Sequence, residues 1–270
     1  MVELAMGSGP GSDPLLCVDI GNTRTVLGLV RAGEVLQHWI VQTDERRTAD
    51  EWGFLVDGLL QRLDDEIAPA GVALCSTVPA VLHEWRAMLA AYFPDCPHVV
   101  VEPGIRTGIP VLMDNPREVG TDRIVNALAA ARLYDGPVVV VAFGTATTFE
   151  VVNAHGQYVG GAIAPGVEIS LEALGRRGAQ LRKVELRRPR SVIAKNTVEA
   201  LQAGALYGYA SQVDGIVTRI ADELGVPLGA LDVVATGTLA PLVLEECTTL
   251  TEHRPLLTLL GLELVFERNA

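Results

Sequence analysis

Two stretches of this 270-residue chain decide the fold: residues 18–25 read VDIGNTRT, and residues 141–148 read VAFGTATT. Each is an apolar run that enters a turn containing Gly and Thr and continues into a second β-rich run. The match needs no gap as far as the glycines of the following turns, Gly33 and Gly156. The repeat predicts two similar domains that face each other across a cleft, although two unrelated β-hairpins would give the same pattern.

Strand and helix signals alternate around these stretches, which predicts an α/β fold. Apolar β-rich runs predict strands at residues 15–20, 25–30, 34–41, 71–76, 98–102 and 231–235. Helical spacing predicts helices at 49–65, 79–92 and 196–224 and one that follows Thr121 as its N-cap, while 253–268 fits a strand or a helix. We expect a flexible leader at 1–14, an N-terminal domain at 15–120 and a C-terminal domain at 121–270.

Composition excludes several classes of protein. Hydrophobic residues make up 49% of the chain, too many for a disordered protein, yet no apolar run approaches the ~18 residues of a membrane span. The formal net charge of −12 argues against broad binding to nucleic acid or membrane surfaces. The four cysteines lack metal-site or redox-motif spacing, so we expect reduced thiols, and with no signal peptide we expect a cytoplasmic protein.

The Gly- and Thr-containing turns predict a phosphate site. Glycine lets backbone N–H groups converge on an anion, and threonine hydroxyls add donors. Two such turns at duplicated positions, and a third at 236–238, fit a nucleoside triphosphate, although a single turn of this kind would be weak evidence. Asp19, at the end of the first predicted strand, is placed to hold Mg²⁺ through water.

Asp122 is the second carboxylate of interest. It opens a predicted helix, where the helix dipole alone favours an acidic residue. Its neighbours Gly120 and Arg123 allow another role, in which the carboxylate accepts a proton from a substrate hydroxyl while the guanidinium binds a substrate carboxylate. Both interpretations stay open on the sequence.

These motifs together resemble the type III pantothenate kinases. The resemblance covers residues 15–268, is nearest to actinobacterial members, and rests on six motifs in order: 19–23 (DIGNT), 120–123 (GTDR), 143–148 (FGTATT), 160–166 (GGAIAPG), 195–197 (KNT) and 235–237 (ATG). It implies two ribonuclease-H-like domains of the acetate and sugar kinase/heat-shock cognate/actin superfamily, with nucleotide in the cleft. It also implies a homodimer that phosphorylates pantothenate to 4'-phosphopantothenate from ATP, for coenzyme A synthesis, using Mg²⁺ and a monovalent cation (K⁺ or NH₄⁺).

The resemblance also implies roles for individual residues. Asp122 would be the catalytic proton acceptor, Asp19 would bind Mg²⁺ through water, and pantothenate would contact Gly120, Thr121, Asp122 and Arg123. ATP and its phosphates would contact Asp19, Ile20, Gly21, Asn22, Thr23, Arg24, Thr25, Val26, Gly144, Thr145 and Gly237.

Two ligand-facing positions depart from the family pattern, and Arg182, Ala194 and Thr238 depart from it elsewhere. Ala142 stands where the family has an aspartate that binds the monovalent cation, and Gly178 stands where it has a threonine that reaches pantothenate. Loss of the carboxylate predicts weakened catalysis. Two alternatives follow: a paralogous kinase for another hydroxyl compound, or an inactive regulator that binds nucleotide or a partner.

One basic run is unexpected in an acidic chain. It is either a solvated loop or hairpin, or a surface that recruits an anionic substrate or partner. Its members are Arg176, Arg177, Arg182, Lys183, Arg187, Arg188 and Arg190.

Overall fold

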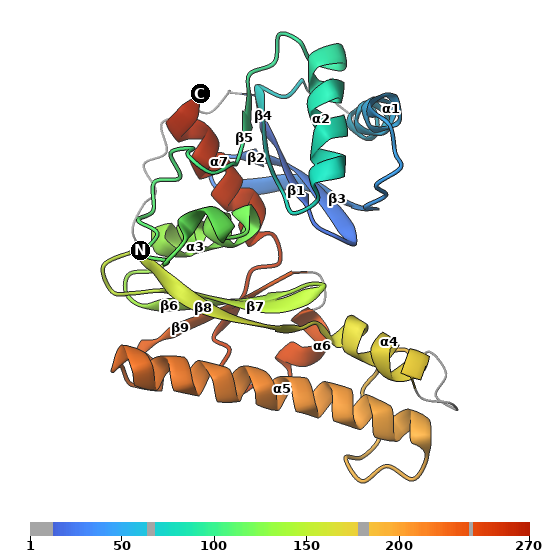
Figure 1. The fold of residues 1–270 in the computed structure, drawn as a ribbon, viewed down its shortest axis with the longest axis vertical. Coiled ribbons are helices and arrows are strands. Elements are labelled where there is room, and N and C mark those ends of the chain that lie inside the picture. The colour runs from blue at the N-terminus through green and yellow to red at the C-terminus, as the bar shows by residue number, and fades with distance from the viewer. Residues whose placement is uncertain (1–12, 64–67, 178–183, 238–239) are drawn as a thin grey trace. The chain divides into compact units, whose positions relative to one another are not determined.

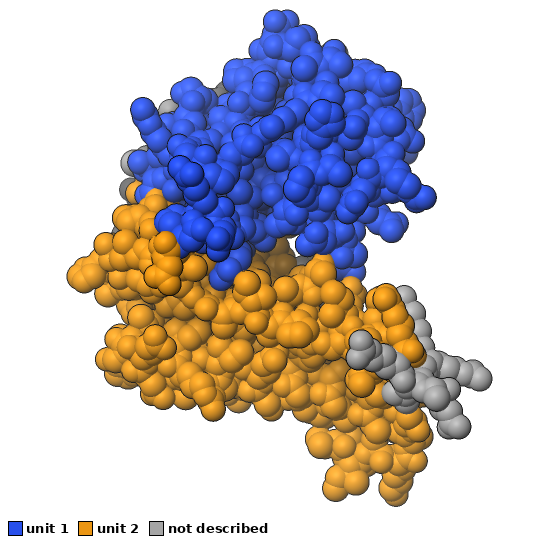
Figure 2. Space-filling model, in the orientation of Figure 1, with its two compact units in different colours: residues 1–108, 115–129, 258–270 blue, residues 109–114, 130–257 orange. Residues whose placement is uncertain are grey.

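The computed structural model describes residues 13–63, 68–177, 184–237 and 240–270. These residues form two compact units, coloured separately in Figure 2. Unit 1 comprises residues 1–108, 115–129 and 258–270, and unit 2 comprises residues 109–114 and 130–257. The closing segment, residues 258–270, therefore belongs to the same compact unit as the first part of the chain. The domain ranges 15–120 and 121–270 stay a prediction. Most of the expected leader lies outside the described residues.

Unit 1 contains a five-stranded mixed sheet in the order β3-β2-β1-β4-β5 (Figure 1). Strand β1 pairs antiparallel with β2 and parallel with β4, and β4 pairs parallel with β5. The strands follow the predicted runs closely: β1 (Leu15–Ile20), β2 (Arg24–Arg31), β3 (Glu34–Gln42), β4 (Gly71–Ser76) and β5 (His98–Val100).

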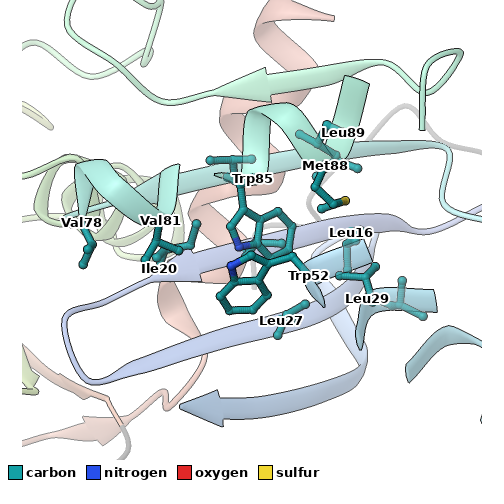
Figure 3. Packing of buried hydrophobic residues seen from close by; sticks show 14 residues of the cluster. Leu16, Ile20, Leu27, Leu29, Trp52, Val78, Val81, Trp85, Met88 and Leu89 are labelled. Atoms are coloured by element: carbon teal, nitrogen blue, oxygen red, sulfur yellow. The ribbon is translucent and has the colours of Figure 1, made fainter. Parts of the chain in front are cut away.

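Helices α1 (Ala49–Leu60) and α2 (Pro79–Tyr92) build the core of unit 1 together with its strands. Trp52 and Trp85 are fully buried, with ring centroids 5.2 Å apart, and they contribute the largest side chains of the cluster in Figure 3. Helix α1 ends earlier than the predicted residue 65. Leu63 packs against the core from a turn, where its N–H donates to Leu60 O, so the apolar spacing continues past the helix itself.

Unit 2 repeats the topology of unit 1. Its sheet has the order β10-β9-β6-β7-β8, so each strand corresponds to one of unit 1 in the same order along the chain. The repeat predicted from the sequence is therefore a duplicated fold rather than two unrelated hairpins. The strands are β6 (Val138–Phe143), β7 (Ala146–Val152), β8 (Tyr158–Pro165), β9 (Asp232–Thr236) and β10 (Glu252–His253).

The gapless alignment of the two repeats is wrong by one residue inside the first turn. Four residues separate the paired Ile20 and Thr25, whereas three separate Phe143 and Thr147. The longer turn between β7 and β8 restores the register before Gly156, which, like Gly33, has positive φ. One deletion and one insertion cancel in the sequence, so the alignment conceals them.

Unit 2 also contains most of the remaining helices. Helix α5 (Thr197–Leu224) begins at its cap Asn196, whose side chain accepts the N–H of Glu199, and ends at Gly225 in the left-handed conformation. No described helix is both long enough and apolar enough to cross a bilayer. The sequence did not predict α4 (Val167–Arg177) or α6 (Ala240–Leu244), and α7 (Leu257–Asn269) shows that the closing segment is helical.

Candidate active site

Asp19 lies near the end of β1, directly beside Cys75 of the parallel strand β4. The Cys75 thiol donates a hydrogen bond to Asp19 Oδ1 over 3.5 Å. Desolvation and the negative charge of Asp122 raise the pKa of Asp19 to about 7, against the lowering effect of the thiol. The two carboxylates therefore belong to one electrostatic cluster, which lies within unit 1.

Helix α3 (Thr121–Leu133) presents Asp122 in its first turn. The prediction that Thr121 caps this helix is wrong: Gly120 O accepts the N–H of Ile124, so Gly120 occupies the cap position. The Thr121 hydroxyl instead donates to Ser76 O at the end of β4, over 3.3 Å. This contact fixes the start of α3 to the strand that carries Cys75.

The Asp122 carboxylate is held by the helix N-terminus. It accepts backbone N–H groups of its own residue and of Arg123, while its Oδ1 atom is buried without a hydrogen-bond partner among the described residues. Burial raises its pKa, against the lowering effect of these hydrogen bonds and of the Arg123 charge. Gly120 leaves room for Oδ1, since a Cβ atom there would lie 2.6 Å from it. A carboxylate oriented in this way is suited to accept a proton.

The first predicted phosphate loop follows β1. Gly21 N–H donates to Arg24 O over 3.1 Å, which closes the turn, and Asn22 and Thr23 are exposed at its tip. Two predicted contact residues, Ile20 and Thr25, are fully buried. Ile20 and Thr25 therefore shape the loop from inside and present no surface to a ligand.

The second predicted loop lies in unit 2, where two glycines enclose Gly144 and Thr145. Gly166 donates its N–H to Thr145 O, and a Cβ atom on Gly166 would lie 2.4 Å from the carbonyl oxygens of both loop residues. Gly237, at φ +92°, would likewise bring a Cβ atom within 2.4 Å of Phe143 O. The three backbone segments pack closely only because these residues have no side chains.

Ala142 lies on β6 opposite Thr148 of β7 and Thr236 of β9. Directly paired residues point to the same face of a sheet, so the Ala142 methyl group stands between two hydroxyl-bearing neighbours. Gly178, the other departure from the family pattern, lies outside the described residues.

The residues of unit 1 fit a divalent cation. Burying Asp19 beside a second carboxylate is costly, which the raised pKa of Asp19 records. The unpartnered Asp122 Oδ1 adds an oxygen of the kind that Mg²⁺ prefers. Within the described residues, no group of three or more His, Cys, Asp or Glu side chains could hold a metal, so water and nucleotide oxygens would complete the shell.

The basic run is largely neutralised by acidic residues. Arg176, Arg187, Arg188 and Arg190 each form an ion pair with a glutamate, which favours the solvated alternative over recruitment of an anion. The pairs are Arg176–Glu172, Arg187–Glu185, Arg188 with Glu245 and Glu246, and Arg190–Glu199.

The sequence analysis missed Cys75 and Gly166 as parts of the two sites. Cys75 is one of four scattered cysteines, and only strand pairing shows that it adjoins Asp19. Gly166 was visible as the last glycine of the 160–166 motif, but its close approach to the loop depends on backbone geometry. All four cysteines are free thiols, as predicted.

The two sheets of matching topology define the class of fold, that of the acetate and sugar kinase/heat-shock cognate/actin superfamily. Solved structures agree on the fold: the inorganic polyphosphate/ATP-glucomannokinase from Arthrobacter sp. strain KM aligns with a TM-score of 0.54 at 18% identity, over 96% of this chain and 100% of that one. The ROK hexokinase from Thermus thermophilus aligns with a TM-score of 0.51 at 14% identity, over 93% and 97%.

Sequence comparison identifies the family within that class. The type III pantothenate kinase family model matches residues 15–219. The type III pantothenate kinase of Nocardioides sp. is 68% identical over 95% of this chain and 100% of its own length, and that of Streptomyces avermitilis is 59% identical over 94% and 98%. This chain belongs to the type III pantothenate kinase family.

Proposed function

We propose that this protein transfers the γ-phosphate of ATP to the hydroxyl of pantothenate, giving 4'-phosphopantothenate for coenzyme A synthesis. Family membership supports the reaction, and one observation supports its chemistry: Asp122 presents a buried, unpartnered carboxylate oxygen fixed at the start of α3. Turnover of ATP with pantothenate, compared with a panel of other hydroxy acids and nucleosides, tests the proposal. Preference for another hydroxyl compound would contradict it.

In the proposed mechanism, Gly120, Thr121 and Arg123 bind pantothenate, with the guanidinium on its carboxylate. Asp122 Oδ1 accepts the proton of the substrate hydroxyl. The hydroxyl oxygen of pantothenate then attacks the γ-phosphorus in line, and ADP leaves with the electron pair of the broken P–O bond. The raised pKa of Asp122 makes it a better proton acceptor than an exposed aspartate.

Asp19 to Val26 and the residues Gly144, Thr145 and Gly237 are the proposed contacts for ATP. Mg²⁺, held through Asp19, would neutralise the charge that develops on the transferred phosphoryl group. Ile20 and Thr25 would support this loop from inside rather than touch ATP, because both residues are fully buried.

Gly166→Ala is expected to raise the KM for ATP about tenfold or more, because the added methyl group would displace the carbonyls of Gly144 and Thr145. Steady-state kinetics at varied ATP measures this change. Gly204→Ala is the matched control, since a Cβ atom there meets nothing within 4 Å. Equal KM values for the two variants would contradict the proposed role of the Gly144–Thr145 loop.

We propose that the response to a monovalent cation is weak in this chain, because Ala142 offers no carboxylate. Ala142→Asp is expected to increase stimulation of kcat/KM by K⁺ or NH₄⁺ about tenfold, since the new carboxylate would stand between Thr148 and Thr236. Assays with and without added cation measure it. Ala142→Asn keeps the shape without the charge, and a cation response equal to that of Ala142→Asp would refute the explanation.

The family resemblance and an exposed apolar surface support a homodimer as the proposed assembly. The surface belongs to α4, the loop before α5 and the start of α5, which lie at one end of unit 2 (Figure 1). The exposed members of this surface are Ile169, Leu174, Val192, Ile193 and Val198. A cytoplasmic location is also proposed, in keeping with the free thiols and the use of ATP.

A further inference from the structure

Thr43 lies next to the first phosphate loop although it is distant from it in sequence. It is the first residue after the edge strand β3, whose last residue Gln42 pairs with Arg24 at the start of β2. The edge strand therefore delivers Thr43 to the open end of the turn formed by residues 21–24. No motif of the sequence analysis included this residue.

Three hydrogen bonds connect Thr43 to the loop. Its backbone N–H donates to Thr23 O over 3.0 Å, and its hydroxyl donates to Gly21 O over 2.7 Å. The Thr25 hydroxyl lies 2.9 Å from the Thr43 hydroxyl. Because the Thr43 proton is already directed at Gly21, Thr25 must be the donor in this contact.

The Thr43 hydroxyl thus satisfies two groups on opposite sides of the turn. Thr25 is fully buried, and Gly21 begins the loop that follows Asp19 and Ile20. Removing the hydroxyl would leave the Gly21 carbonyl and the buried Thr25 hydroxyl without the partner that holds them together, so the turn would lose this constraint. A phosphate loop depends on fixed peptide orientations, so this loss would reach the nucleotide.

We propose that Thr43 is a positioning residue for ATP: its hydroxyl fixes the backbone of residues 21–25 in the geometry that receives the phosphates. The proposal rests on the proposed function insofar as the loop binds ATP. Thr43 itself acts through Gly21 and Thr25 and makes no contact with pantothenate in this scheme, so its effect belongs to the nucleotide step alone.

The test compares three variants of the full chain: Thr43→Val, Thr43→Ser and Thr48→Val. Valine keeps the shape of threonine without the hydroxyl, and serine keeps the hydroxyl. Thr48 caps α1 through the N–H of Glu51, so its replacement destabilises a nearby element without removing a loop contact. The readouts are the Kd of Mg²⁺ with a non-hydrolysable ATP analogue by calorimetry, the KM for ATP and for pantothenate, and thermal unfolding.

Thr43→Val is expected to weaken the nucleotide Kd and raise the KM for ATP about tenfold, with the KM for pantothenate unchanged. Thr43→Ser is expected to restore both values to within about threefold of the natural protein. A normal nucleotide Kd in folded Thr43→Val, an equal loss in Thr48→Val, or no restoration by serine would overturn the proposal. If the natural protein binds nucleotide but does not phosphorylate pantothenate, the proposed function fails while calorimetry still decides the role of Thr43.

Discussion

Asp122→Asn is expected to lower kcat about 10²- to 10⁴-fold while the KM for ATP stays within a few-fold of its natural value. Asparagine keeps the size of the side chain but cannot accept the proton of the pantothenate hydroxyl. The first turn of α3 should persist, since the Thr121 contact with Ser76 and the Gly120 cap remain. Initial rates at saturating ATP and pantothenate, with far-UV circular dichroism as the check on folding, measure the effect.

Asp114→Asn is the matched control for this substitution, because Asp114 is exposed and lies outside the carboxylate cluster. It should leave kcat unchanged. Removing the buried charge of Asp122 should also lower the pKa of Asp19, since that charge contributes to its rise. If folded Asp122→Asn turned over at the natural rate, Asp122 would keep only its structural role at the start of the helix.

Local sequence patterns predicted the fold well where a strand or helix has one clear pattern, either a short apolar run or apolar residues at helical spacing. Alternation of short apolar runs and helical spacing predicted the strands of unit 1 and the start of α1, since burial of Trp52 and Val56 depends on spacing alone. Duplication predicted a second domain similar to the first, and the second sheet repeats the strand order of the first. The patterns also allowed α4, because Val167, Leu171 and Leu174 stand at helical spacing, but this helix was not predicted.

The site was predictable to the extent that its residues stand in glycine-containing motifs. Asp19, Asp122 and the two loops were proposed in this way, and the structure groups the two carboxylates within unit 1. Thr43 and Cys75 could not be identified from the sequence, because only strand pairing brings them to their partners. Thr43 lies 22 positions from Gly21 in the sequence, and Cys75 lies 56 positions from Asp19. Thr121 was predicted to cap α3 because threonine is common at helix N-caps. In the structure the Thr121 hydroxyl instead donates to Ser76 O at the end of β4.

The largest effect on stability is expected from Asp19→Asn. The folded-state pKa of Asp19, about 7, lies above the ordinary value of 3.8, so between these values the folded protein holds a proton that the unfolded chain releases. The free energy of unfolding of the metal-free protein therefore falls as pH rises through this window, and the penalty is complete above pH 7. Asparagine removes the penalty, which is on the order of 2–4 kcal/mol.

Metal-free Asp19→Asn is accordingly expected to unfold at a higher temperature than the natural protein at pH 8, and at nearly the same temperature near pH 4. Thermal unfolding in EDTA across this range measures the difference. Asp95→Asn, at an exposed position, should leave the pH dependence as it is. Identical pH profiles for the natural protein and Asp19→Asn would contradict the buried, ionisable state assigned to Asp19.

The same proton connects stability to catalysis. Because Mg²⁺ binds the ionised carboxylate, the natural protein is expected to bind Mg²⁺ with ATP up to about tenfold more weakly for each pH unit below 7. Binding in this range should release the proton of Asp19 to the buffer. Asp19→Asn should lose this pH dependence together with about 10²-fold or more of kcat/KM. Calorimetry in buffers of different ionisation enthalpy detects the proton directly. A variant that is more stable yet nearly inactive would mean that the ionised Asp19 carboxylate destabilises the metal-free fold and is stabilised only when the metal and the nucleotide bind.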